Sequence, residues 1–177
     1  MISTKYIDRY IEKMKKIQDE ILKAINTEED SAPEDEIIHN LTKLNILDNN
    51  DVFRSFLHLI SIIYQNHHQH QYNLKILENI ISYYKKDILN NFQNCEIFTI
   101  FNNDNKLLLF LLKSEILKID KFVIKTLKED NYSSYFFPEV KDFLETSKKA
   151  EIEAKITDDF LEKRQIGENH THICNLI

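Results

Sequence analysis

Glycine and proline are nearly absent from this chain, which has one glycine and two prolines in 177 residues. Soluble proteins usually contain about 7% glycine and about 5% proline. Tight turns, bulges and strand–helix loops depend on these two residues, so their scarcity predicts long helices joined by polar turns of asparagine, aspartate and serine. A chain with one glycine also cannot form the glycine-rich phosphate loops of P-loop and dinucleotide-binding proteins.

Cysteine is also scarce, and acidic residues outnumber basic ones by 29 to 23. The two cysteines, Cys95 and Cys174, are far apart and lack CxxC spacing, as is typical of proteins from a reducing compartment. The net charge of −6 argues against a nucleic-acid partner, because such partners usually need a basic surface. The N-terminus has no secretory h-region, and the longest apolar stretch, "KLLLFLLKSEIL", is too short to span a bilayer. We therefore expect a cytoplasmic protein with no membrane partner.

Apolar residues recur every three or four positions along most of the chain, which is typical of amphipathic helices. Residues 5–26 are the clearest example, and their apolar stripe suits either packing on the rest of the protein or self-association as a homo-oligomer. The acidic stretch "NTEEDSAPEDE", residues 26–36, is expected to be a loop. Further helices are predicted from Pro33 to about Leu47, from Val52 to Tyr64, and over residues 72–92, 94–102, 104–116, 119–130 and 138–166.

Four residues are predicted to begin or end these helices. Asn94 and Asp120 are expected N-caps, because their short side chains accept hydrogen bonds from free backbone N–H groups. Pro138 suits the first turn of the last helix, and Gly167 suits the left-handed position that ends it.

No strand-like alternation of apolar and polar residues extends over a useful length of the sequence. The predicted fold class is therefore all-α: stacked helical hairpins that form an irregular bundle or an ankyrin-like α-solenoid cap.

Histidine and cysteine are the residues with the most chemical potential. His67, His68 and His70 lie together in "QNHHQH", and imidazole is a common ligand of zinc, copper and nickel. No cysteine joins them, and a polar turn between helices explains the same residues without a metal. Cys95 lies in an apolar run, which predicts a buried, unreactive thiol rather than a nucleophile paired with His58 or His67. We predict no enzymatic activity and no cofactor.

The turn "NYSSYFFPEV" is unusually rich in aromatic residues. Aromatic residues at helical spacing usually belong to the core, but in a loop their rings and hydroxyl groups can form a protein-binding spot. The predicted interaction residues of this turn are Tyr132, Tyr135, Phe136 and Phe137.

Three stretches in the second half of the chain carry a family resemblance. They are "FTIFNNDNKLLLFL" at residues 98–111, the aromatic-Pro-Glu turn at 137–139, and "KRQIGEN" at 163–169. Over roughly residues 50–177, the chain resembles helical domains of unknown function that precede ankyrin-repeat arrays in large protein families of parasitic protists.

This resemblance implies a non-catalytic scaffold or protein–protein interaction domain that caps the first ankyrin-type repeat. It also implies that "ENHTHICNLI" begins that repeat, with interaction residues Gly167, His170, His172 and Ile173 at the joint. The predicted organisation is an N-terminal amphipathic helix at 1–30, a helical core domain at 31–166, and the start of a following ankyrin-like repeat at 167–177. The alternative is a metal-dependent enzyme or metal-binding module that uses the histidine cluster. The sequence identifies no particular protein partner.

Overall fold

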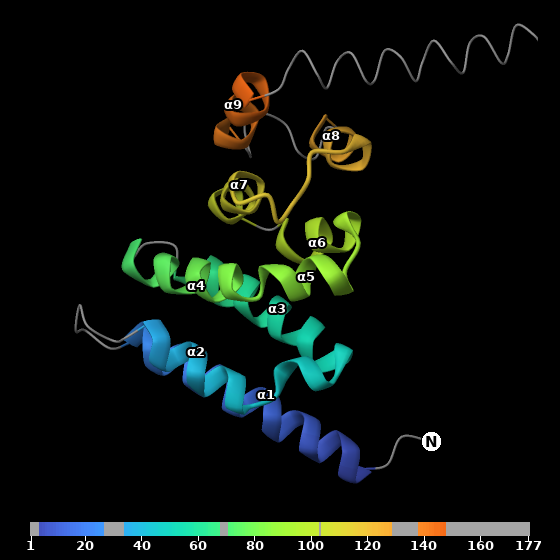
Figure 1. Ribbon diagram of the computed structural model, residues 1–177. Coiled ribbons are helices and arrows are strands. Elements are labelled where there is room, and N and C mark those ends of the chain that lie inside the picture. The colour runs from blue at the N-terminus through green and yellow to red at the C-terminus, as the bar shows by residue number, and fades with distance from the viewer. Residues whose placement is uncertain (1–3, 27–33, 68–70, 103, 129–137, 148–177) are drawn as a thin grey trace, which may run out of the picture. The chain divides into compact units, whose positions relative to one another are not determined.

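The computed structural model describes residues 4–26, 34–67, 71–102, 104–128 and 138–147 (Figure 1). Every secondary-structure element in these ranges is a helix, which confirms the predicted all-α fold class. None of these helices is both long enough and apolar enough to cross a membrane. The chain divides into two units, one that ends at Ile119 and one that begins at Asp120.

The first unit is formed by seven α-helices and one short 3-10 helix in the described ranges. In chain order they are α1 (Thr4–Asn26), α2 (Glu34–Lys43), η1 (Ile46–Asp48), α3 (Asn50–Asn66), α4 (Gln71–Tyr83), α5 (Lys85–Asn91), α6 (Asn94–Phe101) and α7 (Asn105–Lys113).

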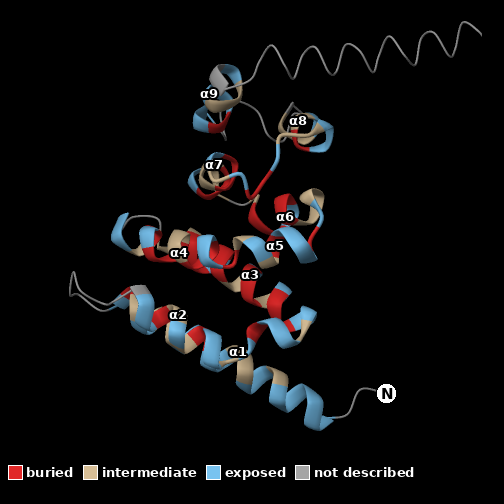
Figure 2. Ribbon diagram, in the orientation of Figure 1, coloured by how far each residue is buried: buried red, intermediate tan, exposed pale blue. Residues whose placement is uncertain are grey.

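α3 is the central helix of this unit and contacts α1, α4, α6 and η1. It can contact several neighbours because its apolar residues are spread over a wide part of its surface rather than confined to a narrow stripe. Figure 2 shows buried positions along its length. The buried residues of α3 are Val52, Phe53, Phe56, Leu57, Ile60, Ser61, Ile63 and Tyr64. α1, α4 and α6 are therefore positioned by their packing on α3, whereas α2 packs on α1 and α4, and α7 packs on α6.

An aromatic cluster joins α3 to both ends of α5. The ring of Tyr84, just before α5, lies edge-on to Phe56 at a centroid separation of 5.2 Å. The ring of Phe92, just after α5, lies 5.5 Å from that of Phe53. Such tilted pairs each contribute about 0.5–1.5 kcal/mol beyond the burial of their area. The cluster thus fixes α5 on the central helix.

The single helix predicted over residues 72–92 is wrong, because the structure divides it at Tyr84. Tyr84 has a ψ of 8°, far from the helical value of about −42°, although its N–H still donates to the Ile80 carbonyl at 3.2 Å. At this bend the Tyr84 ring enters the aromatic cluster, and the next residue, Lys85, donates to the Ser114 carbonyl at 2.6 Å. Tertiary contacts of Tyr84 and Lys85 therefore divide a segment whose apolar spacing is typical of one continuous helix.

α1 confirms the helix predicted over residues 5–26 and packs on the bundle. Ile17, Ile21 and Ile25 are buried, and the helix contacts α2, α3 and α4. The predicted extension of the second helix to Leu47 is wrong, since α2 ends at Lys43. Asn45 follows in the left-handed region at φ 49°, which asparagine tolerates better than most residues, and η1 begins after it.

Side chains close the N-termini of three helices in this unit. Asn49 caps α3 by accepting from the Asp51 N–H at 2.8 Å, and Asp104 caps α7 by accepting from the Lys106 N–H at 2.8 Å. α6 has a capping box in which the Glu96 carboxylate accepts from the Gln93 N–H at 2.9 Å and the Gln93 side chain accepts in return from the backbone. These contacts satisfy N–H groups that a helix cannot satisfy by itself.

The predicted cap at Asn94 is therefore wrong, because Gln93 occupies that position. The Asn94 amide instead pairs with the backbone of Lys118. Its Nδ2 donates to the Lys118 carbonyl at 2.8 Å, and its Oδ1 accepts from the Lys118 N–H at 2.8 Å. One side chain thus joins the start of α6 to the segment that follows α7.

α7 ends in a Schellman motif with glutamate at the left-handed position. Glu115 has φ 58°, and its N–H donates to the Leu112 carbonyl at 3.2 Å. The Ile116 N–H donates to the Leu111 carbonyl at 3.0 Å, and both of these side chains are buried. This is the hydrogen-bond pattern and apolar contact of the motif, in which glycine is the usual residue at the left-handed position.

The second unit contains two described helices, α8 (Lys121–Lys128) and α9 (Pro138–Ser147). Asp120 caps α8 as predicted, accepting from the Val123 N–H at 2.9 Å. Pro138 is the first residue of α9, as predicted, where its missing N–H has no cost. The rest of the predicted long helix, with Gly167 at its end, lies outside the described residues.

Candidate functional site

All of the interaction residues predicted from the sequence lie outside the described residues. They are Tyr132, Tyr135, Phe136, Phe137, Gly167, His170, His172 and Ile173. Two of the candidate metal ligands, His68 and His70, also lie outside the described residues.

His67 is the one member of the histidine cluster whose position the structure describes. It is half-buried at the C-terminal end of α3, and its N–H donates to the carbonyls of Ile63 at 3.0 Å and Tyr64 at 3.3 Å. Within the described part of the chain, no three histidine, cysteine, aspartate or glutamate side chains lie close enough together to hold a metal ion. The role that the structure gives His67 is to end α3.

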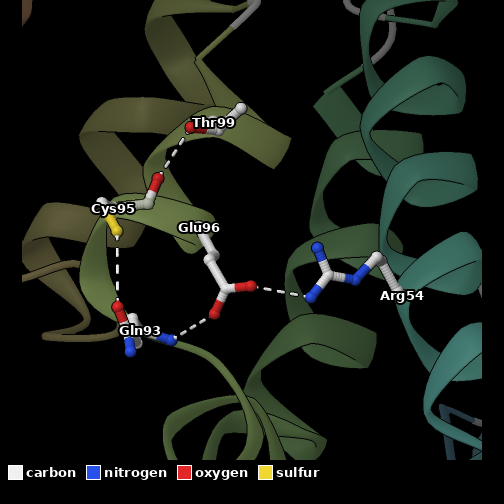
Figure 3. Close-up of polar contacts among 5 residues, drawn as sticks. All are labelled: Arg54, Gln93, Cys95, Glu96 and Thr99. Atoms are coloured by element: carbon white, nitrogen blue, oxygen red, sulfur yellow. Dashed lines mark hydrogen bonds and ion pairs between the residues drawn. The ribbon is translucent and has the colours of Figure 1, made fainter.

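A polar contact between distant segments joins α3 to α6 (Figure 3). Arg54 of α3 donates from Nη2 to Oε1 of Glu96 at 2.7 Å, and its guanidinium lies 5.3 Å from the centre of the Phe92 ring. A cation at this distance is attracted to the ring face. The other Glu96 oxygen, Oε2, accepts from the Gln93 N–H in the capping box.

Both oxygens of Glu96 are therefore engaged, and this has an electrostatic consequence. The hydrogen bond from the Gln93 N–H, followed by that from Arg54, holds the pKa of Glu96 below its usual range. A carboxylate with a lowered pKa and occupied lone pairs is a poor general base near neutral pH. Its geometry suits an anchor that orients α6 on α3. No local pattern in the sequence points to this pair, since the two residues are 42 positions apart.

Cys95 is half-buried, so the prediction of a buried core thiol is wrong. It lies in the first turn of α6, where Ile97 and Phe98 take the inward positions. Its Sγ donates weakly to Oε1 of Gln93 at 3.8 Å, and its carbonyl accepts from the Thr99 hydroxyl at 2.8 Å (Figure 3). Its polar contacts are therefore with α6 and its cap, and no histidine takes part in them.

A tyrosine–glutamate pair joins α3 to α4, in which the tyrosine is buried and the glutamate is half-buried. Tyr64 is 1% exposed, and its hydroxyl donates to Oε1 of Glu78 at 3.0 Å. Burial raises the pKa of both groups, and the Glu78 charge raises that of Tyr64 further. Burial also raises the pKa of Tyr84 to about 12. These groups lie among packed helices, so their altered pKa values follow from packing rather than from a reactive site.

Exposed apolar side chains are the remaining candidates for function. α1 has three of them within six residues, whereas the others are spread over several elements of the described chain. The full set is Tyr6, Ile7, Ile11, Leu47, Ile62, Tyr72, Tyr83, Leu89 and Phe122. A cluster of this kind more often marks a contact surface than a single exposed apolar residue does. The helical periodicity identified the α1 stripe but could not tell which part of it the bundle covers.

Comparison with known protein families, with curated proteins and with solved structures found no match for this chain. A function is therefore inferred from the contacts of the chain itself.

Proposed function

We propose that this chain is a non-catalytic scaffold domain that binds other proteins through apolar helix faces, and that it caps the first of a set of ankyrin-type repeats. The observation that carries this proposal is the α6–α7 hairpin. Its helices have eight and nine residues, contact each other, and are separated by only three residues of the sequence. Short helix pairs of this size are the building units of helical repeat proteins.

The hairpin also has the apolar surface that stacking requires. Its buried residues are Ile97, Phe98, Ile100, Phe101, Leu107, Leu108, Leu111 and Leu112. A repeat unit cannot cover such faces alone and depends on neighbours, as α6 depends here on α3. A capping domain provides an apolar face for the first repeat and leaves a polar surface toward water. The partner is then a protein with a complementary apolar face.

The polar contacts of the first unit favour a structural role over catalysis. Glu96, Asn94 and Glu78 each link separate segments, and each is engaged with a helix end, a backbone segment or a buried tyrosine. An active site instead needs acids, bases or nucleophiles that converge on a space for substrate. The free, half-buried Cys95 fits the reducing cytoplasm that we propose as the location.

The capping role can be tested with the polypeptide that the same reading frame encodes after Ile177. Repeats from that segment would be prepared alone and fused to residues 1–177, and their unfolding would be followed by circular dichroism and hydrogen exchange. We expect the first repeat to unfold at a higher temperature in the fusion, because its apolar end is covered. An unchanged unfolding temperature, or a following segment without helical repeats, would contradict the capping role.

The metal alternative has its own test. Zinc and nickel chloride would be titrated into the 1–177 chain and into a triple variant with His67, His68 and His70 changed to alanine, with the heat measured by calorimetry. Stoichiometric binding by the wild type, lost in the triple variant, would favour a metal-binding module over the scaffold proposal.

A further inference from the structure

The apolar stripe of α1 is covered over only part of its length. In the C-terminal half of the helix, Ile17 and Ile21 are fully buried against the bundle. In the N-terminal half, Ile7 is 44% exposed and Ile11 is 57% exposed. Figure 2 shows this contrast along α1, with exposed positions gathered toward its N-terminus. Ile7 and Ile11 therefore lie at the edge of the apolar stripe, beside the part that the bundle covers.

The N-terminal half of α1 is nevertheless held in a fixed orientation. The hydroxyl of Tyr6 accepts from Nδ2 of Asn49 at 3.0 Å, and the hydroxyl of Tyr10 hydrogen-bonds to that of Ser55. The two tyrosines are four residues apart and share one face of the helix, and Ile7 and Ile11 share the neighbouring face. The contacts of the tyrosines with the start of α3 turn the Ile7–Ile11 face away from the unit. The face is thus presented to other molecules by a helix that is already folded and positioned.

Two charged side chains of opposite sign lie on either side of Ile11 along the helix. Asp8 lies three residues before Ile11 and Lys15 lies four residues after it, so all three side chains are on the same face of the helix. Both charged side chains are exposed, and neither forms an ion pair or hydrogen bond with any residue that the structure describes. By contrast, Glu12 and Lys16 pair with each other at 2.8 Å.

We propose that a second copy of this chain covers this surface, with two α1 helices antiparallel about a two-fold axis at Ile11. In that arrangement Asp8 of each chain meets Lys15 of the other. At 1.5 Å per residue, Asp8 lies about 4.5 Å on one side of the axis and Lys15 about 6 Å on the other. The mismatch of about 1.5 Å is within the reach of a lysine side chain. The surface is therefore self-complementary in both charge and apolar character, as a two-fold contact requires.

The size of the surface sets the expected strength of the dimer. A stable interface usually buries about 800 Å² per partner, and the exposed stripe of α1 is smaller. We therefore expect a weak dimer with a dissociation constant of roughly tens to hundreds of micromolar. This self-association goes beyond the proposed function and does not depend on it, because the partner is the same chain rather than a repeat array.

The apolar contact at the proposed two-fold axis is tested with Ile11→Glu. The matched control is Ile62→Glu, on α3. Ile62 is also an exposed isoleucine, at 52%, so both variants should fold, which circular dichroism verifies. Sedimentation equilibrium of the 1–177 chain would be measured from about 10 µM to about 1 mM. We expect the wild type and Ile62→Glu to dimerise with similar constants, and Ile11→Glu to weaken the dimer at least tenfold. A wild type that stays monomeric throughout, or equal loss in both variants, would refute the proposal.

The two-fold arrangement is tested by reversing each charge separately. Asp8→Lys and Lys15→Asp each place like charges together in a homodimer, and we expect each to weaken it about three- to tenfold. In an equimolar mixture, every contact between the two variants is again between opposite charges, so a heterodimer of near wild-type strength should form. A mixture no stronger than its components would refute the antiparallel register. So would single variants that dimerise like the wild type.

Discussion

The left-handed turn after α7 gives a prediction in which a single substitution should stabilise the protein. Glu115 adopts φ 58°, a conformation that costs a residue with a Cβ atom about 1–2 kcal/mol. Glycine avoids this cost but loses about 0.5–1 kcal/mol more backbone entropy on folding. Glu115→Gly should therefore increase the free energy of unfolding by about 0.5–1 kcal/mol. The exposed Glu115 side chain has no hydrogen bond or ion pair with a described residue, so its removal breaks no such contact.

Two controls separate the backbone effect from the others. Glu115→Ala removes the negative charge from the end of α7, where the helix dipole disfavours it, but keeps the Cβ atom, so it should recover only a few tenths of a kcal/mol. Lys118→Gly places a glycine nearby at a residue without positive φ, and should lower stability by about 0.4–1 kcal/mol. Glu115→Ala thus measures the effect of removing the charge, and Lys118→Gly measures the backbone entropy cost of introducing a glycine.

Thermal unfolding by circular dichroism and urea unfolding would measure the three variants. For a chain of this length, 1 kcal/mol corresponds to about 2–4 °C in the unfolding temperature. Glu115→Gly should therefore unfold about 1–4 °C above the wild type. If Glu115→Gly is no more stable than Glu115→Ala, the turn carries no backbone strain and the reasoning is refuted.

Three further substitutions test the contacts inside the first unit. Glu78→Gln should stabilise the protein at pH 7, because burial raises the pKa of Glu78 and glutamine still accepts from Tyr64. The gain in urea midpoint should vanish below about pH 4.3, where the carboxyl group is protonated. A loss of stability at pH 7 would contradict this prediction. Glu96→Gln should be less stable than the wild type at pH 7, because the pKa of Glu96 is lowered in the folded protein. The difference in stability between variant and wild type should shrink as the pH falls through that lowered pKa. A difference that does not change with pH would contradict this prediction. Phe56→Ala, at a fully buried position, should lose about 3–5 kcal/mol in urea unfolding, and a loss below about 1 kcal/mol would argue against the aromatic cluster.

The helices could be predicted from the sequence because their signals are local. The apolar spacing of residues 5–26 gave α1 within one residue of its observed start, and Asp120 and Pro138 marked the starts of α8 and α9 correctly. The bend at Tyr84 could not be predicted, because it depends on contacts with Phe56 and with the end of α7. The cap of α6 was misassigned by one residue because asparagine is the commoner cap, while here its amide binds Lys118.

Contacts between distant helices are harder to predict for the same reason. Arg54 and Glu96 lie on different helices, and neither has a local signal that points to the other. The sequence showed an apolar stripe on α1, but the burial of Ile21 and the exposure of Ile11 depend on where the bundle ends. Burial of Cys95 was predicted from its apolar neighbours, whereas in a helix the neighbours along the chain point in other directions.

The scarcity of glycine has a consequence for how the helices can be used. The left-handed turns of the first unit fall on Asn45 and Glu115, and the helix starts are closed by Asn49, Asp104 and the capping box at Gln93. Because these polar ends are satisfied by nearby residues, a neighbouring helix or protein needs only to match an apolar side. Packing then depends mainly on apolar area, which favours stacking of helix pairs and weak contacts through exposed faces such as that of α1. Polar links such as Arg54–Glu96 add orientation to this stack rather than most of its stability.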